Sequence, residues 1–339
     1  MNSVMLLVLT GAFLIASQPV VNSLPYSTVP DSSKVVLRPI YVGHGLSTVL
    51  SNGCSISIFD AGGSEPGFAR LRKELLDRRT ASQQAPKIDT LLISHIHKDH
   101  IGYLPQIAKD KVKIGTFISN LHAKQKASKL GILNLFGEPR MIFMGVSTAH
   151  YKSVQLPMND PLKCTSKRIN IELLWGTLNV SDPGMTDLYM RHRENNDSVV
   201  SGINGDITPV LFLGDMNIVG QKLLLKSAQS QLAKYKGGVV IAAHHGFSNG
   251  IYEELFRFLK PKTVIISRSH MRPMIKEDIE AIDRHISGPG KREARLVDYN
   301  SKTKKSKMDI SPNSPKLYQT NVSQSIIQLS PNHRVEIVL

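Results

Sequence analysis

The segment LLISHIHKDHIG, residues 91–102, contains the pattern that decides the fold. At the end of an apolar run it places four metal-binding residue types within six positions: His95, His97, Asp99 and His100. Alternation along an extended backbone puts His95 and His97 on one side, so both imidazoles can reach one cation. A turn then directs Asp99 and His100 toward a second position. Imidazole and carboxylate are ligands of zinc and similar divalent metals, so the segment predicts a metal centre rather than a His-rich surface turn.

Apolar, β-branched runs alternate with helical stretches on both sides of this segment. Strands are predicted at residues 35–42, 47–50, 56–59, 88–94, 116–119, 141–144, 171–174, 198–200, 210–213, 239–242 and 263–267. Helical spacing of apolar residues predicts helices at 66–79, 220–235, 252–259 and 275–285. Because strands outnumber helices and the two mix along the chain, the pattern favours sheets covered by helices.

The spacing His-x-His-x-Asp-His resembles the signature of the metallo-β-lactamase superfamily. Further motifs are similar to the branch formed by the hydrolase domain of ComEC-type competence proteins. In the order of that family these are YVGHGLSTVL at 41–50, Asp60-Ala61-Gly62, Asn195-Asn196-Asp197-Ser198, Leu213-Gly214-Asp215, His244-His245-Gly246 and Lys260-Pro261-Lys262. The resemblance covers about residues 42–267 and implies an α/β fold, an αββα sandwich, as a single hydrolase domain over residues 24–339.

The resemblance also implies a pair of divalent metal ions, zinc first and manganese as the alternative. The implied ligands are His95 and His97 for the first metal, Asp99, His100 and His245 for the second, and Asp215 as a bridge between them. Many members of the superfamily have one more histidine on the first metal. Here the candidates are His122, His150 and His192, or instead Asn195, Asn196 or water. The opening glycine turn also departs from the family, because Tyr41 and His44 stand where Asp and Gln are usual.

Two cations roughly 4 Å apart can share a water, lower its pKa toward neutrality and so provide a hydroxide nucleophile. Asp99 is the candidate for orienting that nucleophile. His244, or a residue of a basic loop at about 287–315, is the candidate for protonating the leaving group or binding a phosphate. This chemistry suits phosphodiesters, lactones, thioesters and β-lactams alike, so the fold does not select the substrate.

Charge favours phosphodiesters among these substrates. The chain has 42 Lys and Arg against 27 Asp and Glu, a net charge of +15 and a pI near 9.7. Such a surface attracts polyanions at long range, which favours a nuclease or other phosphodiesterase acting on DNA or RNA. A small-substrate esterase of the phosphorylcholine esterase or lactonase type is the alternative. A polyanion-binding module with a vestigial metal site is the non-enzymatic one.

The first 23 residues predict a signal peptide and therefore secretion of the mature protein. An apolar run at residues 4–16 is followed by small residues at Val21 and Ser23, ahead of cleavage before Leu24. The run is too short to favour a stable membrane span, although an uncleaved anchor is the alternative. Cys54 and Cys164 fit no metal-ligand spacing and leave open one disulfide or two free thiols.

Overall fold

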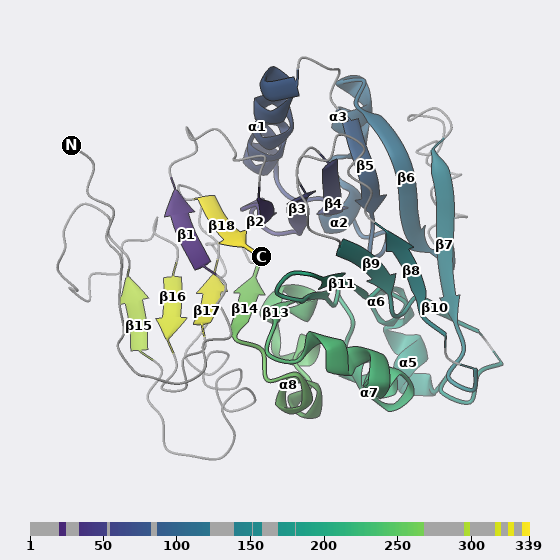
Figure 1. The fold of residues 1–339 in the computed structure, drawn as a ribbon. Coiled ribbons are helices and arrows are strands. Elements are labelled where there is room, and N and C mark those ends of the chain that lie inside the picture. Colours follow the sequence, from purple (N-terminus) through teal and green to yellow (C-terminus); the bar gives the residue numbers. More distant parts are fainter. Residues whose placement is uncertain are drawn as a thin grey trace.

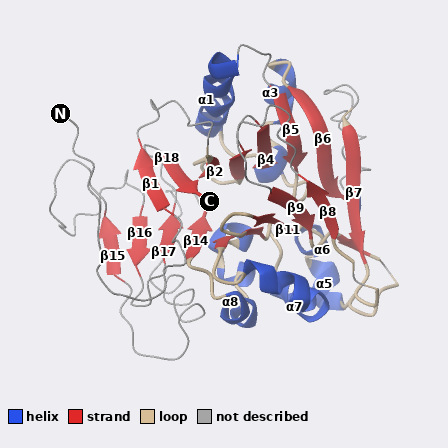
Figure 2. Ribbon diagram, in the orientation of Figure 1, coloured by secondary structure: helices blue, strands red, loops and turns tan. Residues whose placement is uncertain are grey.

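A computed structural model describes residues 20–24, 34–52, 55–82, 87–122, 139–150, 152–157, 169–179, 181–267, 295–298, 316–319, 325–328 and 334–339. Within these ranges two β-sheets pack face to face, and helices cover their outer faces (Figures 1 and 2). This arrangement is an αββα sandwich and confirms the predicted fold class.

The first sheet combines an antiparallel and a parallel part. Its order is β1 (Val20–Leu24), β18 (Arg334–Val338), β2 (Val35–Pro39), β3 (Ser47–Asn52), β4 (Ser55–Ala61), β5 (Lys87–Leu92), β6 (Lys113–Asn120), β7 (Arg140–Val146) and β10 (Thr177–Leu178). From β4 to β7 the strands run parallel. The crossovers contain α1 (Glu65–Ser82), α2 (Lys98–Ile101) and α3 (Leu104–Lys109). The carboxyl ends of β4 and β5 therefore lie at one edge, where Asp60 and the histidine segment meet.

The second sheet repeats this design. Its order is β15 (Arg295–Asp298), β16 (Lys316–Gln319), β17 (Ser325–Gln328), β14 (Thr263–Ile266), β13 (Val239–Ile241), β12 (Val210–Phe212), β11 (Ser201–Gly205), β9 (Ile169–Leu173) and β8 (Val154–Pro157). Strands β12, β13, β14 and β17 are parallel. The helices and short 3-10 turns on this half are α5 (Asp187–Arg191), α6 (Arg193–Asn196), α7 (Ile218–Leu232), η2 (Ala233–Tyr235), η3 (Ala243–Gly246), η4 (Ser248–Gly250) and α8 (Glu253–Leu259).

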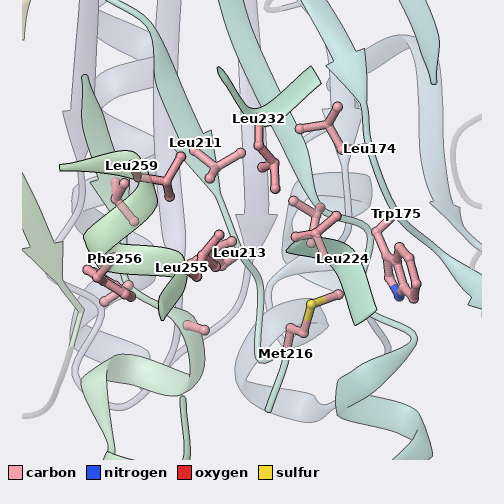
Figure 3. Close-up of a cluster of buried hydrophobic side chains, with 14 of the residues drawn as sticks. Leu174, Trp175, Leu211, Leu213, Met216, Leu224, Leu232, Leu255, Phe256 and Leu259 are labelled. Atoms are coloured by element: carbon pink, nitrogen blue, oxygen red, sulfur yellow. The ribbon is translucent and has the colours of Figure 1, made fainter. Parts of the chain in front are cut away.

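Three apolar clusters hold the four layers together. Between the sheets, the rings of Phe59 and Phe212 stack with centroids 4.0 Å apart. On the outer face of the first sheet, Leu71 of α1 and Ile107 of α3 are buried against the strands. On the outer face of the second sheet, Figure 3 shows side chains of α7 and α8 beside the strand residue Leu211. The clusters bury both faces of each sheet, which places the polar chemistry at the sheet edge.

The predicted strands and helices of the described ranges are present, with one shift in position. The strand predicted at 198–200 begins instead at Ser201. Val199 leaves the ladder because its N–H donates to the carbonyl of Ser94, 2.7 Å away, at the end of the other sheet. The helix predicted at 275–285 and both cysteines lie outside the described residues. Of the predicted basic loop, residues 295–298 are described, and they form β15.

The N-terminal strand overlaps the predicted signal peptide. Residues 20–24 form β1, which pairs antiparallel with β18, so the predicted cleavage before Leu24 falls inside this strand. Among the described residues, no helix combines the length and the apolar character needed to cross a membrane.

Candidate metal centre

The predicted metal ligands converge from both halves of the sandwich. His95 and His97 lie between β5 and α2, and Asp99 and His100 lie in α2. From the second sheet, Asp215 follows β12, and His245 lies in η3 after β13. In the part of the chain that the structure describes, potential ligand atoms form two groups, each within 4.8 Å: Asp99, His100, Asp215 and His245 in one, and His95, His97 and Asp215 in the other.

The group of four consists mostly of buried residues. His100 Nε2 is 3.1 Å from Asp215 Oδ1, and His245 Nε2 is 3.2 Å from Asp99 Oδ2. The side chains of His100, Asp215 and His245 are buried, whereas Asp99 is one quarter exposed. We call this group the second-metal site.

The group of three shares Asp215 with it. His95 Nε2 is 2.9 Å from His97 Nδ1 and 3.8 Å from Asp215 Oδ2. His95 is fully buried, but the side chain of His97 is 35% exposed. We call this group the first-metal site. The carboxylate of Asp215 faces both groups: Oδ1 is 3.1 Å from His100 Nε2, and Oδ2 is 3.8 Å from both His95 Nε2 and His245 Nε2. Asp215 is therefore placed to bridge the two groups.

These residues fit a pair of divalent cations. Imidazole nitrogens and carboxylate oxygens are borderline ligands of the kind that zinc and manganese accept. His100 Nε2 and Asp215 Oδ1 are buried and lie 3.1 Å apart, and neither has another hydrogen-bond partner among the described residues. Polar atoms buried with so few partners are costly, and a cation bound by both would satisfy them.

A buried contact network orients His100 and His95. Asp60 Oδ2 lies 2.9 Å from His100 Nδ1 and accepts the Ser94 hydroxyl at 2.8 Å. Since a carboxylate accepts hydrogen bonds, Nδ1 of His100 carries a proton and Nε2 faces Asp215. The Ser94 hydroxyl, which donates to Asp60, can accept from His95 Nδ1 at 3.1 Å. Asp60 has a φ of 56°, a strained value for a residue with a side chain, which is typical of functional sites.

His245 is oriented by the end of a neighbouring strand. Its Nδ1 donates to the backbone carbonyl of Ser267 over 2.8 Å, which leaves Nε2 for a metal. Its φ is 55°, so η3 turns sharply after β13 to present the ring. The Ser267 hydroxyl donates to the carbonyl of Gly45 at 2.6 Å. The opening glycine turn and the His-His-Gly turn are therefore tied to one strand end.

Comparisons with known proteins agree with this arrangement. A sequence model described as the metallo-beta-lactamase superfamily matches residues 40–270, and these include all the candidate ligands. The chain belongs to the metallo-β-lactamase superfamily. A comparison with curated protein sequences gave no significant match.

Solved structures similar to this metallo-β-lactamase-fold chain have low sequence identity. The metallo-beta-lactamase fold protein YhfI from Bacillus subtilis is 10% identical, with a TM-score of 0.44. The match covers 74% of this chain and 93% of that protein. A diphosphatase of the PhnP family is 12% identical with a TM-score of 0.41, covering 76% and 93%. A variant of the CmlA β-hydroxylase is 16% identical with a TM-score of 0.40, covering 76% and 51%.

Burial and charge shift the pKa values of this metallo-β-lactamase site in opposite directions. Burial lowers the pKa of His95 well below its ordinary value, and His100 nearby adds to the effect. For His100, burial alone would lower the pKa, but the charges of Asp215 and Asp60 outweigh it and raise the pKa well above 6.5. For Asp215, burial alone would raise the pKa, but His100 and His245 hold it well below 3.8. Without metal, His100 and Asp215 therefore form a buried ion pair.

The two candidate catalytic residues occupy different positions. Asp99 lies in the second-metal site, and the neighbouring imidazoles of His245 and His100 hold its pKa low despite partial burial. His244 is half-buried beside the site, with its Nδ1 2.8 Å from Asn249 Oδ1 and its ring centroid 6.3 Å from that of His245. It belongs to neither ligand group. A role toward substrate therefore stays a prediction for both residues.

His44 of the divergent glycine turn also reaches the site. Its Nε2 is 3.5 Å from Asp99 Oδ2, and its ring centroid is 4.8 Å from that of His245. Its side chain is 40% exposed. The departure from the family pattern thus puts an imidazole at the mouth of the second-metal site, which sequence reasoning did not assign.

The three candidate histidines for a further first-metal ligand do not join either group. His150 and His192 are exposed, and His122 Nε2 lies 2.8 Å from Asp197 Oδ2. None of the three belongs to either ligand group. Asn196 is buried, and its side chain pairs with Tyr189 and the backbone N–H of Asn217. For Asn195 a place near the first metal stays a prediction.

The Asn-Asn-Asp-Ser segment instead supports the bridging carboxylate from outside. The Ser198 hydroxyl accepts the backbone N–H of Asp215 at 3.1 Å, and the Asn196 side-chain oxygen accepts that of Asn217 at 3.2 Å. Asp60, Ser94 and Ser198 were missed as positioning residues from sequence. The sequence could have pointed to these three residues, because they lie in or beside the motifs that carry the family resemblance.

Proposed function

We propose that this protein is a dinuclear metal-dependent phosphodiesterase that cleaves nucleic acid and is exported after removal of residues 1–23. Membership of the superfamily supports metal-dependent hydrolysis as the class of reaction. The observation that carries the proposal is Asp215, whose carboxylate faces histidines of both ligand groups, in a chain of net charge +15. Placement in a ComEC-like branch remains part of the proposal and rests on the ordered motifs.

Zinc or manganese bound at the two sites would polarise a phosphate oxygen and lower the pKa of a water molecule toward neutrality. The residues of the chain provide the frame for that chemistry. Asp215 holds the two sites together, and Asp60 and Ser267 keep Nε2 of two histidines turned inward. Asp99 is one quarter exposed and is proposed to orient the nucleophile. His244, at the rim, is proposed to donate to the leaving-group oxygen.

Charge supports a phosphodiester over a neutral ester or lactam. Each backbone phosphate is anionic, and a basic protein gathers such chains near its surface. Lys98 is exposed and stands between the ligand residues His97 and Asp99 in the chain, so the ligand segment itself carries a cationic residue. The exposed His44 gives the mouth a hydrogen-bond donor for phosphate oxygens.

The test uses purified protein reconstituted with zinc or with manganese. We expect cleavage of plasmid and single-stranded DNA, and turnover of bis-p-nitrophenyl phosphate. Asp215→Ala should abolish both activities, whereas Asp110→Ala, which removes only an exposed ion pair with Arg72, should leave them unchanged. Intact DNA together with turnover of phosphorylcholine esters or a lactone would favour a small-substrate esterase. Salt-sensitive DNA binding without any hydrolysis would favour a binding module.

Nucleic acid as the partner is tested through the basic segment. Replacing Lys302, Lys304, Lys305 and Lys307 with Gln changes charge outside the described strand β15. We expect weaker DNA binding and a salt dependence shallower by up to about one unit per lysine that contacts phosphate. Unchanged affinity and unchanged salt dependence would remove this segment from the proposed DNA contact.

A further inference from the structure

Each ligand histidine has a partner on the ring nitrogen that faces away from its metal site. For His95, His100 and His245 these partners are Ser94, Asp60 and the carbonyl of Ser267, all buried. For His97 the partner is Glu194, whose Oε2 lies 2.7 Å from His97 Nε2. Glu194 comes from α6, in the region of the chain where the superfamily often has another first-metal histidine.

We propose that Glu194 is the positioning residue of the first-metal site and sets the affinity of that site through His97. A carboxylate can only accept a hydrogen bond, so His97 Nε2 carries the ring proton. The neutral ring then leaves Nδ1 as the free nitrogen, and Nδ1 is the atom that faces His95 at 2.9 Å. The carboxylate thereby selects the tautomer that can bind metal and fixes the plane of the ring.

The geometry separates this role from direct ligation. Glu194 contacts the nitrogen opposite the one that faces the ligand group. Its carboxylate also does not belong to the group formed by His95, His97 and Asp215. The first-metal site consequently has three protein ligands among the described residues, and it depends more on the orientation of each one.

The backbone that carries Glu194 is held firmly although its side chain is 54% exposed. The indole N–H of Trp175 donates to the carbonyl of Asn196 at 3.0 Å. The side-chain amide of Asn120 donates to the carbonyl of Asp197, also at 3.0 Å. Because these bonds anchor the end of α6, the glutamate needs to order only its own side chain. Residues 194–198 therefore serve both His97, through Glu194, and Asp215, through Ser198.

The experiment measures metal binding without substrate, so its outcome is independent of the proposed phosphodiesterase activity. Zinc affinity is determined by chelator competition and cobalt coordination by absorption spectroscopy, in the wild type, Glu194→Ala and Glu194→Gln. His97→Ala provides the reference for a lost first-metal ligand. Glu253→Gln is the matched control, since it removes a similarly exposed carboxylate that pairs with Arg257. Thermal denaturation of each apo-protein checks that it is folded.

We expect Glu194→Ala to weaken the first metal about 10- to 100-fold and to leave the second metal unchanged. Glu194→Gln keeps an acceptor oxygen and should recover part of the loss. The cobalt spectrum of Glu194→Ala should change only in the contribution that His97→Ala removes. First-metal affinity equal to the wild type in Glu194→Ala would overturn the proposal. So would equal weakening of both metals in a folded variant, because the effect would then not act through His97.

Discussion

The two metal sites share Asp215 but differ in almost every other respect. The second-metal site has four candidate ligands, and three of them are buried. The first-metal site has three, and its outermost histidine and the carboxylate behind it are partly exposed. A site with more ligands and buried supporting contacts is better preorganised. The comparison indicates a tightly held second metal and a more exchangeable first metal with more open coordination positions.

The largest loss of metal is expected when the shared residue Asp215 is removed. Asp215→Ala should weaken both metals by more than about 100-fold, the upper end of the effect of losing an outer contact. The reason is that both groups lose a ligand and His100 loses its negative partner. Metal content after dialysis is the measurement. If one metal stays at full occupancy, Asp215 does not bridge.

Each site also has ligands that the other site does not share, and removing one of these should release only the metal of that site. His245→Ala should lose the second metal and keep the first, whereas His97→Ala should do the reverse. In the wild type, a chelator titration should remove the first metal before the second. Two equal release steps, or loss of both metals from both variants, would contradict the asymmetry.

The buried contact between Asp60 and His100 supports the second-metal site. Asp60→Asn removes the carboxylate behind His100, and we expect the second metal to bind about 10- to 100-fold more weakly. Asparagine tolerates the positive φ of this position, so the backbone conformation is retained. Asp89→Asn is the control, because Asp89 accepts the backbone N–H of Ile56 away from the site. A larger loss at the first metal than at the second would show that Ser94, not Asp60, transmits the effect.

A smaller effect is expected from pH, which should change the affinity of the second metal. The raised pKa of His100 means that the apo-protein is protonated there at neutral pH, so binding of the second metal should release about one proton. Its affinity should fall by up to about tenfold per pH unit of acidification. Calorimetry in buffers of different ionisation enthalpy measures the proton count. Release of no proton would indicate that His100 is already neutral.

The pKa shifts of His100 and Asp215 also determine how the stability of the apo-protein changes with pH. His100 has a raised pKa, so its stabilising contribution is complete below 6.5 and is lost as the pH rises through the folded-state value. Asp215 has a lowered pKa, so its contribution is present above 3.8 and is lost as the pH falls through its folded-state value. The melting temperature in chelator should decrease at alkaline pH. The metal-loaded protein should not show the alkaline decrease, because His100 is then neutral throughout.

The sequence by itself predicted the fold class and the cluster of metal-binding residues. Both follow from local patterns, since alternating apolar runs predict strands and the spacing from His95 to His100 predicts converging ligands. The resemblance in ordered motifs added Asp215 and His245, although they lie far along the chain. The fold class and these ligands could be predicted because each is encoded by a short stretch of sequence.

The residues that support the ligands are brought to them only by the folding of the chain. Asp60 and His100 are 40 positions apart, and His97 and Glu194 are 97 apart. Such pairs meet because parallel strands end at one edge of a sheet and because α6 packs beside the other sheet's ligand loop. Their contacts depend on side-chain direction after packing, which no local spacing encodes. For the same reason the sequence could propose His122, His150, His192, Asn195 and Asn196 near the first metal, while the fold brought Glu194 to His97.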